Sequence, residues 1–164
     1  MPKFRMKVDH RMSPDILQAI GDFVVSFAEI EYSLKLGIQT LLSCSAPHKG
    51  VVTADKSISQ LIDMLRELYR TSDNQRVPIE TIDRLCDEAE KVRTFRNYLM
   101  HATLTAVDHD TVELEKRARG KKLKLKVKKF NITQLNEITE QAKYVAGDLV
   151  GIWMGYHEIT PRVI

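Results

Sequence analysis

An unbroken apolar stripe near the start of the chain constrains the fold more than any other feature of the sequence. Its members recur at steps of three and four residues, the spacing of one helix face: Ile16, Ile20, Phe23, Phe27, Ile30, Leu34 and Leu41. Ser13, Pro14 and Asp15 come just before the stripe and are typical of an N-cap, a first helical position and a first turn. The sequence therefore predicts a long amphipathic helix that begins near Ser13, as expected for a mainly helical fold.

Three more helices show the same period. They are expected from about Ser57 to Tyr69, from about Pro78 to Ala102, and from Asn131 or Thr133 onward to Tyr156. The segment from Ser43 to Asp55, which contains a proline and a glycine, is expected to be a loop. Glycines spaced four apart in the last helix indicate a face that another helix approaches closely, either from the same chain or from a second subunit.

The period changes from helical to alternating after the third helix. Thr103 to Val107, Val112 to Lys116 and Lys122 to Val127 are predicted strands, with turns at Asp108 to Asp110 and at Arg119 to Lys121. A small β-hairpin or three-stranded insertion is therefore expected between the third and the last helix, over about residues 103–130.

This insertion is strongly basic. Nine basic residues and no acidic one lie between Lys116 and Lys129, whereas the whole chain has a net charge of only +3. Alternation puts four lysines on one face of the third strand: Lys122, Lys124, Lys126 and Lys128. Such a patch is the electrostatic footprint expected for nucleic acid, although lysines on an edge strand also guard against aggregation. The sequence leaves both interpretations open.

The composition is that of one globular domain over residues 1–164. The chain has 43% hydrophobic and 29% charged residues, and it contains neither an apolar run of membrane-spanning length nor an export signal. Cys44 and Cys86 are isolated in sequence, so both are expected to be reduced and structural in a cytoplasmic protein. The five histidines have no spacing that would collect a metal with cysteines or carboxylates. No metal, no cofactor and no membrane partner are expected.

The candidate site lies near the end of the third predicted helix, in the segment VRTFRNYLMH that ends at His101. Arg96 falls on the apolar stripe, where its charge requires a carboxylate or a phosphate. At about 100° per residue, one arc of the helix carries Arg93, Arg96, Asn97 and His101. The arginine suits negative charge and the histidine suits proton transfer, as needed for phosphate chemistry. A structural interpretation stays open, in which Arg96 pairs with a buried acid and His101 favours the negative end of the helix dipole.

With Arg96, Asn97 and His101 in these positions, RNYLMH resembles the motif of the HEPN superfamily (higher eukaryote and prokaryote nucleotide-binding domains). The order of long helix, helix, motif helix, insertion and final helix is also similar to the HEPN core, so the resemblance covers most of the chain outside the hairpin. It implies an antiparallel helical bundle. It also implies metal-independent RNA cleavage, which many members perform in toxin, antiviral and RNA-processing systems.

In that family the motif residues line a cleft across a homodimer. By resemblance, Arg96 would stabilise charge on the phosphorane, and Asn97 would orient the phosphate or His101. His101 would take or give a proton while the 2′-hydroxyl attacks the adjacent phosphate, leaving a 2′,3′-cyclic phosphate and a 5′-hydroxyl. Thr103 stands where members modified by a partner nucleotidyltransferase have a tyrosine, so control by that route is not expected.

Glu31 is the expected supporting residue, because it lies beside an apolar row of the first helix and needs a cation. Arg96 or Arg93 is one candidate partner, and Lys35 is the other. One function is a HEPN ribonuclease, a toxin or antiviral effector with a neutralising partner such as an antitoxin. The alternatives are a non-catalytic HEPN dimer that binds or senses nucleic acid or nucleotide, and a structural interaction domain in which Arg96 pairs with Glu31. The completeness of the motif favours the ribonuclease.

Overall fold

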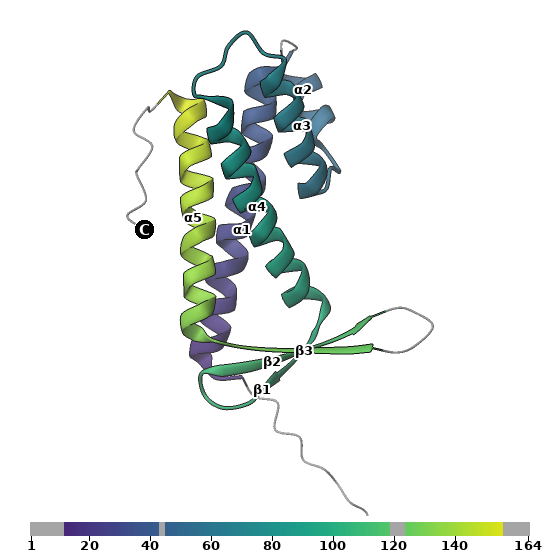
Figure 1. Ribbon diagram of the computed structural model, residues 1–164, viewed down its shortest axis with the longest axis vertical. Helices are drawn as coiled ribbons and strands as arrows, with labels where there is room; N and C mark the ends of the chain where they lie inside the picture. Colours follow the sequence, from purple (N-terminus) through teal and green to yellow (C-terminus); the bar gives the residue numbers. More distant parts are fainter. Residues whose placement is uncertain (1–11, 43–44, 119–123, 156–164) are drawn as a thin grey trace, which may run out of the picture.

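A computed structural model describes residues 12–42, 45–118 and 124–155 of the chain (Figure 1). Its elements follow the order α1 (Pro14–Leu41), α2 (Ala46–Thr53), α3 (Ile58–Arg70), α4 (Ile79–His101), β1 (Thr103–Ala106), β2 (Thr111–Ala118), β3 (Lys124–Asn131) and α5 (Ile132–Met154). The predicted mainly helical fold, with a small sheet between the motif helix and the last helix, is confirmed. No helix within the described ranges is long and apolar enough to cross a membrane.

The helices α1 and α5 begin at the same place, the turn between β1 and β2. The Ser13 side chain accepts a hydrogen bond from the backbone N–H of Ile16 at 3.3 Å and donates one to the carbonyl of His109 at 2.6 Å. The backbone N–H of Ile132 donates to the carbonyl of Asp110 at 3.0 Å. One turn of the sheet therefore anchors the N-terminal ends of both helices.

The helices α1 and α5 consequently run parallel, and α4 runs antiparallel to both (Figure 1). At the far end of the pair Gly37 of α1 lies against Trp153 of α5, and Arg76, just before α4, donates to the Trp153 carbonyl at 2.6 Å. The expected antiparallel bundle is thus correct for α4 but wrong for the α1–α5 pair. The reason is that α5 starts at the end of the bundle where α4 finishes, so α1 and α5 both run opposite to α4 and therefore parallel to each other.

The expected loop from Ser43 to Asp55 is also wrong, because α2 occupies most of it. Pro47 stands in the first turn of α2, where proline is tolerated because its missing N–H has no helical partner there. The end of α2 is tied to α1 by a hydrogen bond of 2.9 Å from Gln39 Nε2 to Thr53 Oγ1. Tertiary contact with α1 thus supports a short helix that composition alone did not indicate.

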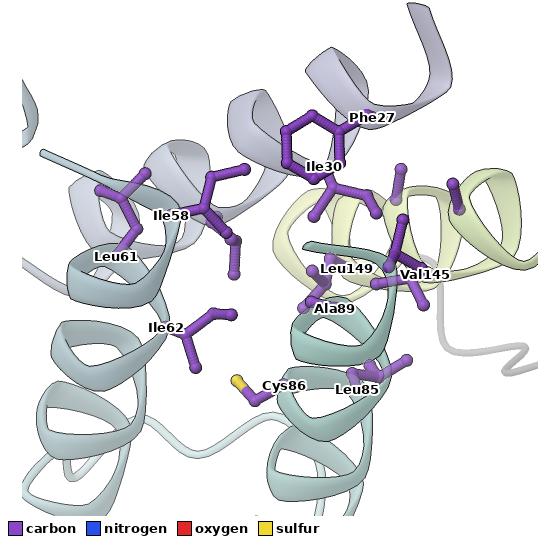
Figure 2. Close-up of a cluster of buried hydrophobic side chains, with 14 of the residues drawn as sticks. Phe27, Ile30, Ile58, Leu61, Ile62, Leu85, Cys86, Ala89, Val145 and Leu149 are labelled. Carbon is purple, nitrogen blue, oxygen red and sulfur yellow. The ribbon is translucent and has the colours of Figure 1, made fainter. Parts of the chain in front are cut away.

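The core lies where α1, α3, α4 and α5 meet, as Figure 2 shows for its central part. The labelled side chains converge from all four helices, and Cys86 of α4 faces Ile62 of α3. Cys86 is a free, buried cysteine, as expected, and burial raises the pKa of its thiol to about 12. Cys44 lies outside the described residues. Packing against this core holds α4 in place. The candidate residues on the outer side of α4 are therefore held in place as well.

The sheet is antiparallel, with β2 between β1 and the edge strand β3. The register pairs Val112 with Phe130 and Leu114 with Lys128. Val112, Leu114 and Phe130 are buried, so this face of the sheet packs on the bundle. Farther along, the β2–β3 hairpin extends past the end of α4 (Figure 1).

Candidate functional site

One face of α4 is buried in the core, and this orientation of the helix determines where the candidate residues lie. Its buried stripe includes Ile82, Leu85, Ala89, Val92 and Leu99. Arg96 and Asn97 lie at the border of that stripe and are half-buried. The Cζ atom of Arg96 lies 5.4 Å from the centroid of the Phe27 ring of α1, within the range of a cation–π contact. The aromatic ring thus holds the guanidinium at the surface of the core.

The side chain of Arg96 lines a cavity of about 250 Å³, which we call the arginine cavity. It lies between α1, the start of α3 and α4, and its lining residues are Phe27, Glu31, Lys56, Ser57, Ile58, Ser59, Arg93, Arg96 and Asn97. Two arginines and a lysine face a single glutamate. The structure therefore brings together four of the predicted site residues, two arginines, an asparagine and Glu31.

Arg96 has no acidic partner in the described part of the chain. No carboxylate oxygen of those residues lies within 4.0 Å of its guanidinium, and its side-chain hydrogen bond is a long one, 3.4 Å from Nη1 to Asn97 Oδ1. A guanidinium cannot release its proton, so partial burial leaves its remaining donors in need of an anion. An incoming phosphate is the kind of anion that its planar donor group fits.

Two other charged residues of the arginine cavity, Glu31 and Arg93, have local partners. Glu31 accepts from Lys35 at 2.6 Å, one turn along α1, and Arg93 donates from Nε to Glu90 Oε2 at 2.7 Å on α4. Hydrogen bonding to Glu90 raises the pKa of Arg93. The structure thus has the Lys35 alternative for Glu31 and not an arginine, because pairs within one helix satisfy both charges over short distances. Among the half-buried charges of the cavity, Arg96 is the one without an ion-pair partner in the described part of the chain, whereas Lys56 is exposed to solvent.

The first turn of α3 forms the remaining wall of the cavity. Ser57 and Gln60 make a capping box, in which Ser57 N–H donates to Gln60 Oε1 at 2.9 Å and Gln60 N–H donates to Ser57 Oγ at 3.3 Å. Ile58 and Ser59, whose N–H groups the box does not use, are among the residues that line the cavity. The positive end of the helix dipole therefore adds to Arg96. Sequence reasoning missed this wall, although the serine and glutamine spacing of a capping box could have indicated it.

His101 lies outside the arginine cavity. It is the last residue of α4, is exposed to solvent, and sits one turn beyond Asn97 on nearly the same side of the helix. The structure therefore brings Arg96 and Asn97 together and leaves His101 at the rim. From this position the imidazole can meet only a substrate that extends out of the cavity along the end of α4.

The predicted lysines lie on the face of β3 that continues the bundle-packing face. The register places Lys124, Lys126 and Lys128 opposite alternate residues of β2, so they share one face, as predicted. Lys128 is exposed, and its Nζ lies 4.9 Å from the ring centroid of Tyr98 on α4. The side chains of Lys124 and Lys126 are outside the described part, and so is all of Lys122. The described lysine thus faces α4 and not open solvent on the far side of the sheet.

The β1–β2 turn brings together three groups that the sequence analysis treated only as a turn. One ligand atom each from Asp108, His109 and Asp110 lies within 4.8 Å of the others. Asp108 is already engaged, since its Oδ1 accepts from the backbone N–H of Asp110 at 3.1 Å and of Thr111 at 2.8 Å. Hydrogen bonding to Asp110 and then to Thr111 lowers the pKa of Asp108 to about 2. These contacts account for the cluster as the hydrogen bonding of a tight turn.

Comparison of the chain with models of protein families, with curated proteins and with solved structures found no match. The function therefore has to be inferred from the site itself. The site consists of a half-buried guanidinium with no carboxylate partner among the described residues, an amide beside it, a helix N-terminus opposite it, and an exposed imidazole one turn away.

Proposed function

We propose that this protein is a metal-independent endoribonuclease of the HEPN type. The observation that carries the proposal is the unpaired, half-buried Arg96, which opens into a cavity with Asn97 and has His101 one turn away. A structural arginine would have been expected to face a carboxylate. A cationic cavity without such a partner instead fits a phosphodiester. The resemblance of RNYLMH to the HEPN motif supplies the reaction type.

The reaction proceeds by attack of a ribose 2′-oxygen on the adjacent phosphorus. The bond from the 2′-oxygen to phosphorus forms, the bond from phosphorus to the 5′-oxygen breaks, and the products are a 2′,3′-cyclic phosphate and a 5′-hydroxyl. His101 takes the proton of the attacking hydroxyl or gives one to the leaving oxygen. Arg96 stabilises the negative charge of the phosphorane, and Asn97 orients the phosphate or the imidazole. Balance requires no redox partner, because the proton lost by one oxygen is gained by the other.

A homodimer is part of the proposal, and an exposed apolar stripe on α1 supports it. Leu17 is 56% exposed, Val25 is 62% exposed and Tyr32 is 64% exposed, although all three belong to a helix whose other side is buried in the core. Helices of soluble proteins normally present polar residues on the outer side. Glu31, next to Tyr32, already lines the arginine cavity. A second copy that covers this stripe would therefore lie beside the cavity and would bring a second one close to it.

The dimer has a direct test with a matched control. Val25→Glu places a charge in the middle of the stripe, and we expect light scattering to show a monomer where the parent chain shows a dimer. Val51→Glu, on α2, changes a valine that is 73% exposed and should leave the dimer intact. A parent chain that is strictly monomeric at micromolar concentration and still cleaves RNA would contradict a composite site.

The position of His101 favours one alternative, a HEPN dimer that binds or senses RNA or nucleotides without cleavage. In the single chain the imidazole is exposed and lies outside the arginine cavity. Such a module would still use Arg96 and Asn97 to bind phosphate. In either case we expect a cytoplasmic protein. As a ribonuclease, it would act as a toxin or antiviral effector together with a neutralising partner such as an antitoxin.

A cleavage assay separates the ribonuclease from the binding module. The protein is incubated with mixed RNA in excess chelator, and the products are examined by mass spectrometry. We expect cleavage to continue and the fragments to end in 2′,3′-cyclic phosphates. A His101→Ala preparation, purified in the same way, controls for contaminating ribonucleases. Loss of all cleavage on chelation would contradict the proposed chemistry, and binding without cleavage would favour the alternative.

A further inference from the structure

A second cavity lies on the other side of α4, between this helix and β3. Its volume is about 370 Å³, close to the lower end of the range of roughly 300–1,000 Å³ that is typical of ligand sites. We call it the aromatic pocket, because Phe95, Tyr98 and Phe130 are among its lining residues. The rings of Phe95 and Phe130 meet edge to face, with their centroids 5.5 Å apart. None of the predicted site residues except Lys128 borders this pocket.

The charged side chains that line the aromatic pocket are all basic in the described part of the chain. Three lysines line the aromatic pocket, Lys91 from α4 and Lys128 and Lys129 from β3, whereas no aspartate or glutamate of the described residues does. Lys91 and Lys128 are exposed, so their ammonium groups can follow a ligand that projects into solvent. Lys129 is shared with Glu113, whose carboxylate lies 3.5 Å away. The ligand that fits such a pocket has a flat apolar part and a negative part attached to it.

Polar donors at the rim fit the same ligand. Gln134 uses its Oε1 to accept from the backbone N–H of Asn131 at 3.1 Å, which leaves its Nε2 without a hydrogen-bond partner among the described residues. The Thr94 hydroxyl, at an exposed position of α4, likewise has no hydrogen-bond partner among the described residues. An amide N–H and a hydroxyl are groups that hydrogen-bond to the edges of nucleobases.

The geometry points to a nucleobase as the occupant: we propose that the aromatic pocket holds one unpaired base of a single-stranded RNA, while Lys91 and Lys128 bind the adjoining phosphates. A base supplies the flat ring for Phe95, Tyr98 and Phe130, and the sugar–phosphate backbone supplies the charge. A double-stranded RNA would not enter, because its bases are stacked inside the helix. The inference rests on the proposed function for the identity of the ligand, and it specifies which form of RNA is bound.

The two cavities are placed so that one strand can reach both. Asn97 of the arginine cavity and Tyr98 of the aromatic pocket are neighbours in sequence on opposite sides of the exposed ridge of α4. His101 lies between them, about 40° around the helix from Asn97 and about 60° from Tyr98. A strand with one base in the aromatic pocket and a phosphate at Arg96 therefore crosses the last turn of α4, where His101 is exposed. This path gives the imidazole, which lies outside the arginine cavity, a way to meet the substrate.

Binding of abasic RNA tests the inference in the unaltered protein. A set of short 2′-O-methyl RNAs, which lack the attacking hydroxyl and so are not cleaved, has one base removed at a time. We expect removal at one register to weaken binding about 5- to 150-fold, as for loss of one stacked base, and removal elsewhere to have little effect. An RNA with a photoreactive uridine at that register should crosslink to Phe95, Tyr98 or Phe130. Equal affinity for all abasic RNAs, or crosslinks only to other segments, would overturn the proposal.

A pocket-filling variant adds a second test. Thr94→Trp should place an indole in the aromatic pocket and abolish the difference between intact and abasic RNA, with the salt dependence of binding unchanged. Thr40→Trp is the matched control, because Thr40 is an exposed threonine near the C-terminal end of α1. This variant should keep the difference in affinity between intact and abasic RNA. Thr94→Trp that still distinguishes the abasic RNA would also overturn the proposal. If Thr94→Trp does not fold, the abasic series and the crosslink decide the question without it.

The outcomes for the pocket and for the proposed function can be told apart. If the protein cleaves RNA but no abasic position weakens binding, the proposed ribonuclease function stands and base binding in the aromatic pocket is overturned. Base-sensitive binding without cleavage would keep the pocket and favour a sensing module. A chain that neither binds nor cleaves RNA would overturn both.

Discussion

The two sides of α4 present positive charge in different ways. On one side Arg96 is half-buried at the edge of the core, with its Cζ atom 5.4 Å from the centroid of the Phe27 ring. On the other side the exposed ammonium of Lys128 lies over the Tyr98 ring at 4.9 Å, on the edge strand of a hairpin that extends past α4. A planar, fixed guanidinium is suited to a defined geometry, whereas a lysine is a flexible point charge.

The difference separates two tasks that a ribonuclease must perform. A fixed donor group can stabilise charge that develops at one phosphorus, because it needs no reorganisation during the reaction. Mobile lysines hold a phosphate backbone without reading its sequence. Substitutions on the arginine side should therefore alter turnover, and substitutions on the lysine side should alter binding.

The largest expected effect is that of His101→Ala, on the ridge between the two sides. Loss of a general acid or base typically lowers the rate about 10²- to 10⁴-fold, so the single-turnover rate with excess protein should fall within that range. His109→Ala is the control, because this histidine is also exposed and contributes its backbone carbonyl to the Ser13 contact. Full activity of His101→Ala would assign the chemistry to another group.

Arg96→Ala is expected to come next, with a loss of about 10²- to 10³-fold in turnover, as for removal of one donor to a developing oxyanion. Arg96→Lys should recover little, because a single ammonium cannot reproduce the planar donor group. Arg93→Ala should cost much less, since that guanidinium is already engaged by Glu90. Equal losses for Arg93→Ala and Arg96→Ala would remove the distinction between paired and unpaired arginines.

A smaller and different effect is expected from changing Lys124, Lys126 and Lys128 together to Ala. RNA binding should weaken for all sequences alike, and the slope of log affinity against log salt should decrease by about 0.7 for each phosphate that a lysine no longer neutralises. Turnover at saturating RNA should remain. Lys143→Ala is a control in which the lysine is on α5 and already paired with Glu140 at 2.7 Å. An unchanged salt slope in the triple variant would mean that these lysines only protect an edge strand.

The elements with strong local signals were predicted well from the sequence. The start of α1 at Ser13, the cap of α5 at Asn131, which was one of two predicted positions, and the shared face of the β3 lysines all follow from short-range rules. The short helix α2 was missed, because its stability depends on contact with α1 and not on its own composition.

Within the single chain, close packing of helices occurs at a glycine of α1 that the glycine spacing in the last helix did not indicate. A Cβ added at Gly147 or Gly155 of α5 would meet nothing within 4 Å, whereas at Gly37 of α1 it would fall 2.5 Å from Trp153. Gly155 instead has φ +84° at the end of α5, a left-handed conformation that favours glycine. Spacing within one helix does not say which neighbour packs on it, so the glycine that matters is found only with the partner in place.

The candidate site shows the same limit. The sequence indicated Arg96, Asn97 and His101 because all are on one helix, but the wall at Ser57 comes from a segment far away in the chain. The partner of Glu31 was left open because an arginine on another helix and Lys35 on its own helix were both reasonable. The structure has Lys35, at 2.6 Å, and that pairing leaves Arg96 without an acidic partner in the described ranges of the chain.

A small change in stability is expected when Arg96 is replaced, and its sign tells whether Arg96 supports the fold. Partial burial of an unpaired charge costs about 1–3 kcal/mol, and the cation–π contact with Phe27 returns only about 0.5–1 kcal/mol. Arg96→Met, which keeps an unbranched side chain against the Phe27 ring, should therefore raise the free energy of unfolding by about 1 kcal/mol in urea denaturation. Arg93→Met loses a helix pair with Glu90 and should not stabilise the chain.

Inorganic phosphate gives the same pair of variants a second readout. An anion that binds the folded state raises its stability by mass action, so phosphate should raise the Tm of the parent chain and of Arg93→Met more than that of Arg96→Met. A general salt effect would raise all three alike. Arg96→Met could instead unfold more easily than the parent chain, with phosphate raising the Tm of both proteins equally. Arg96 would then be a structural residue, and its proposed role in catalysis would be wrong.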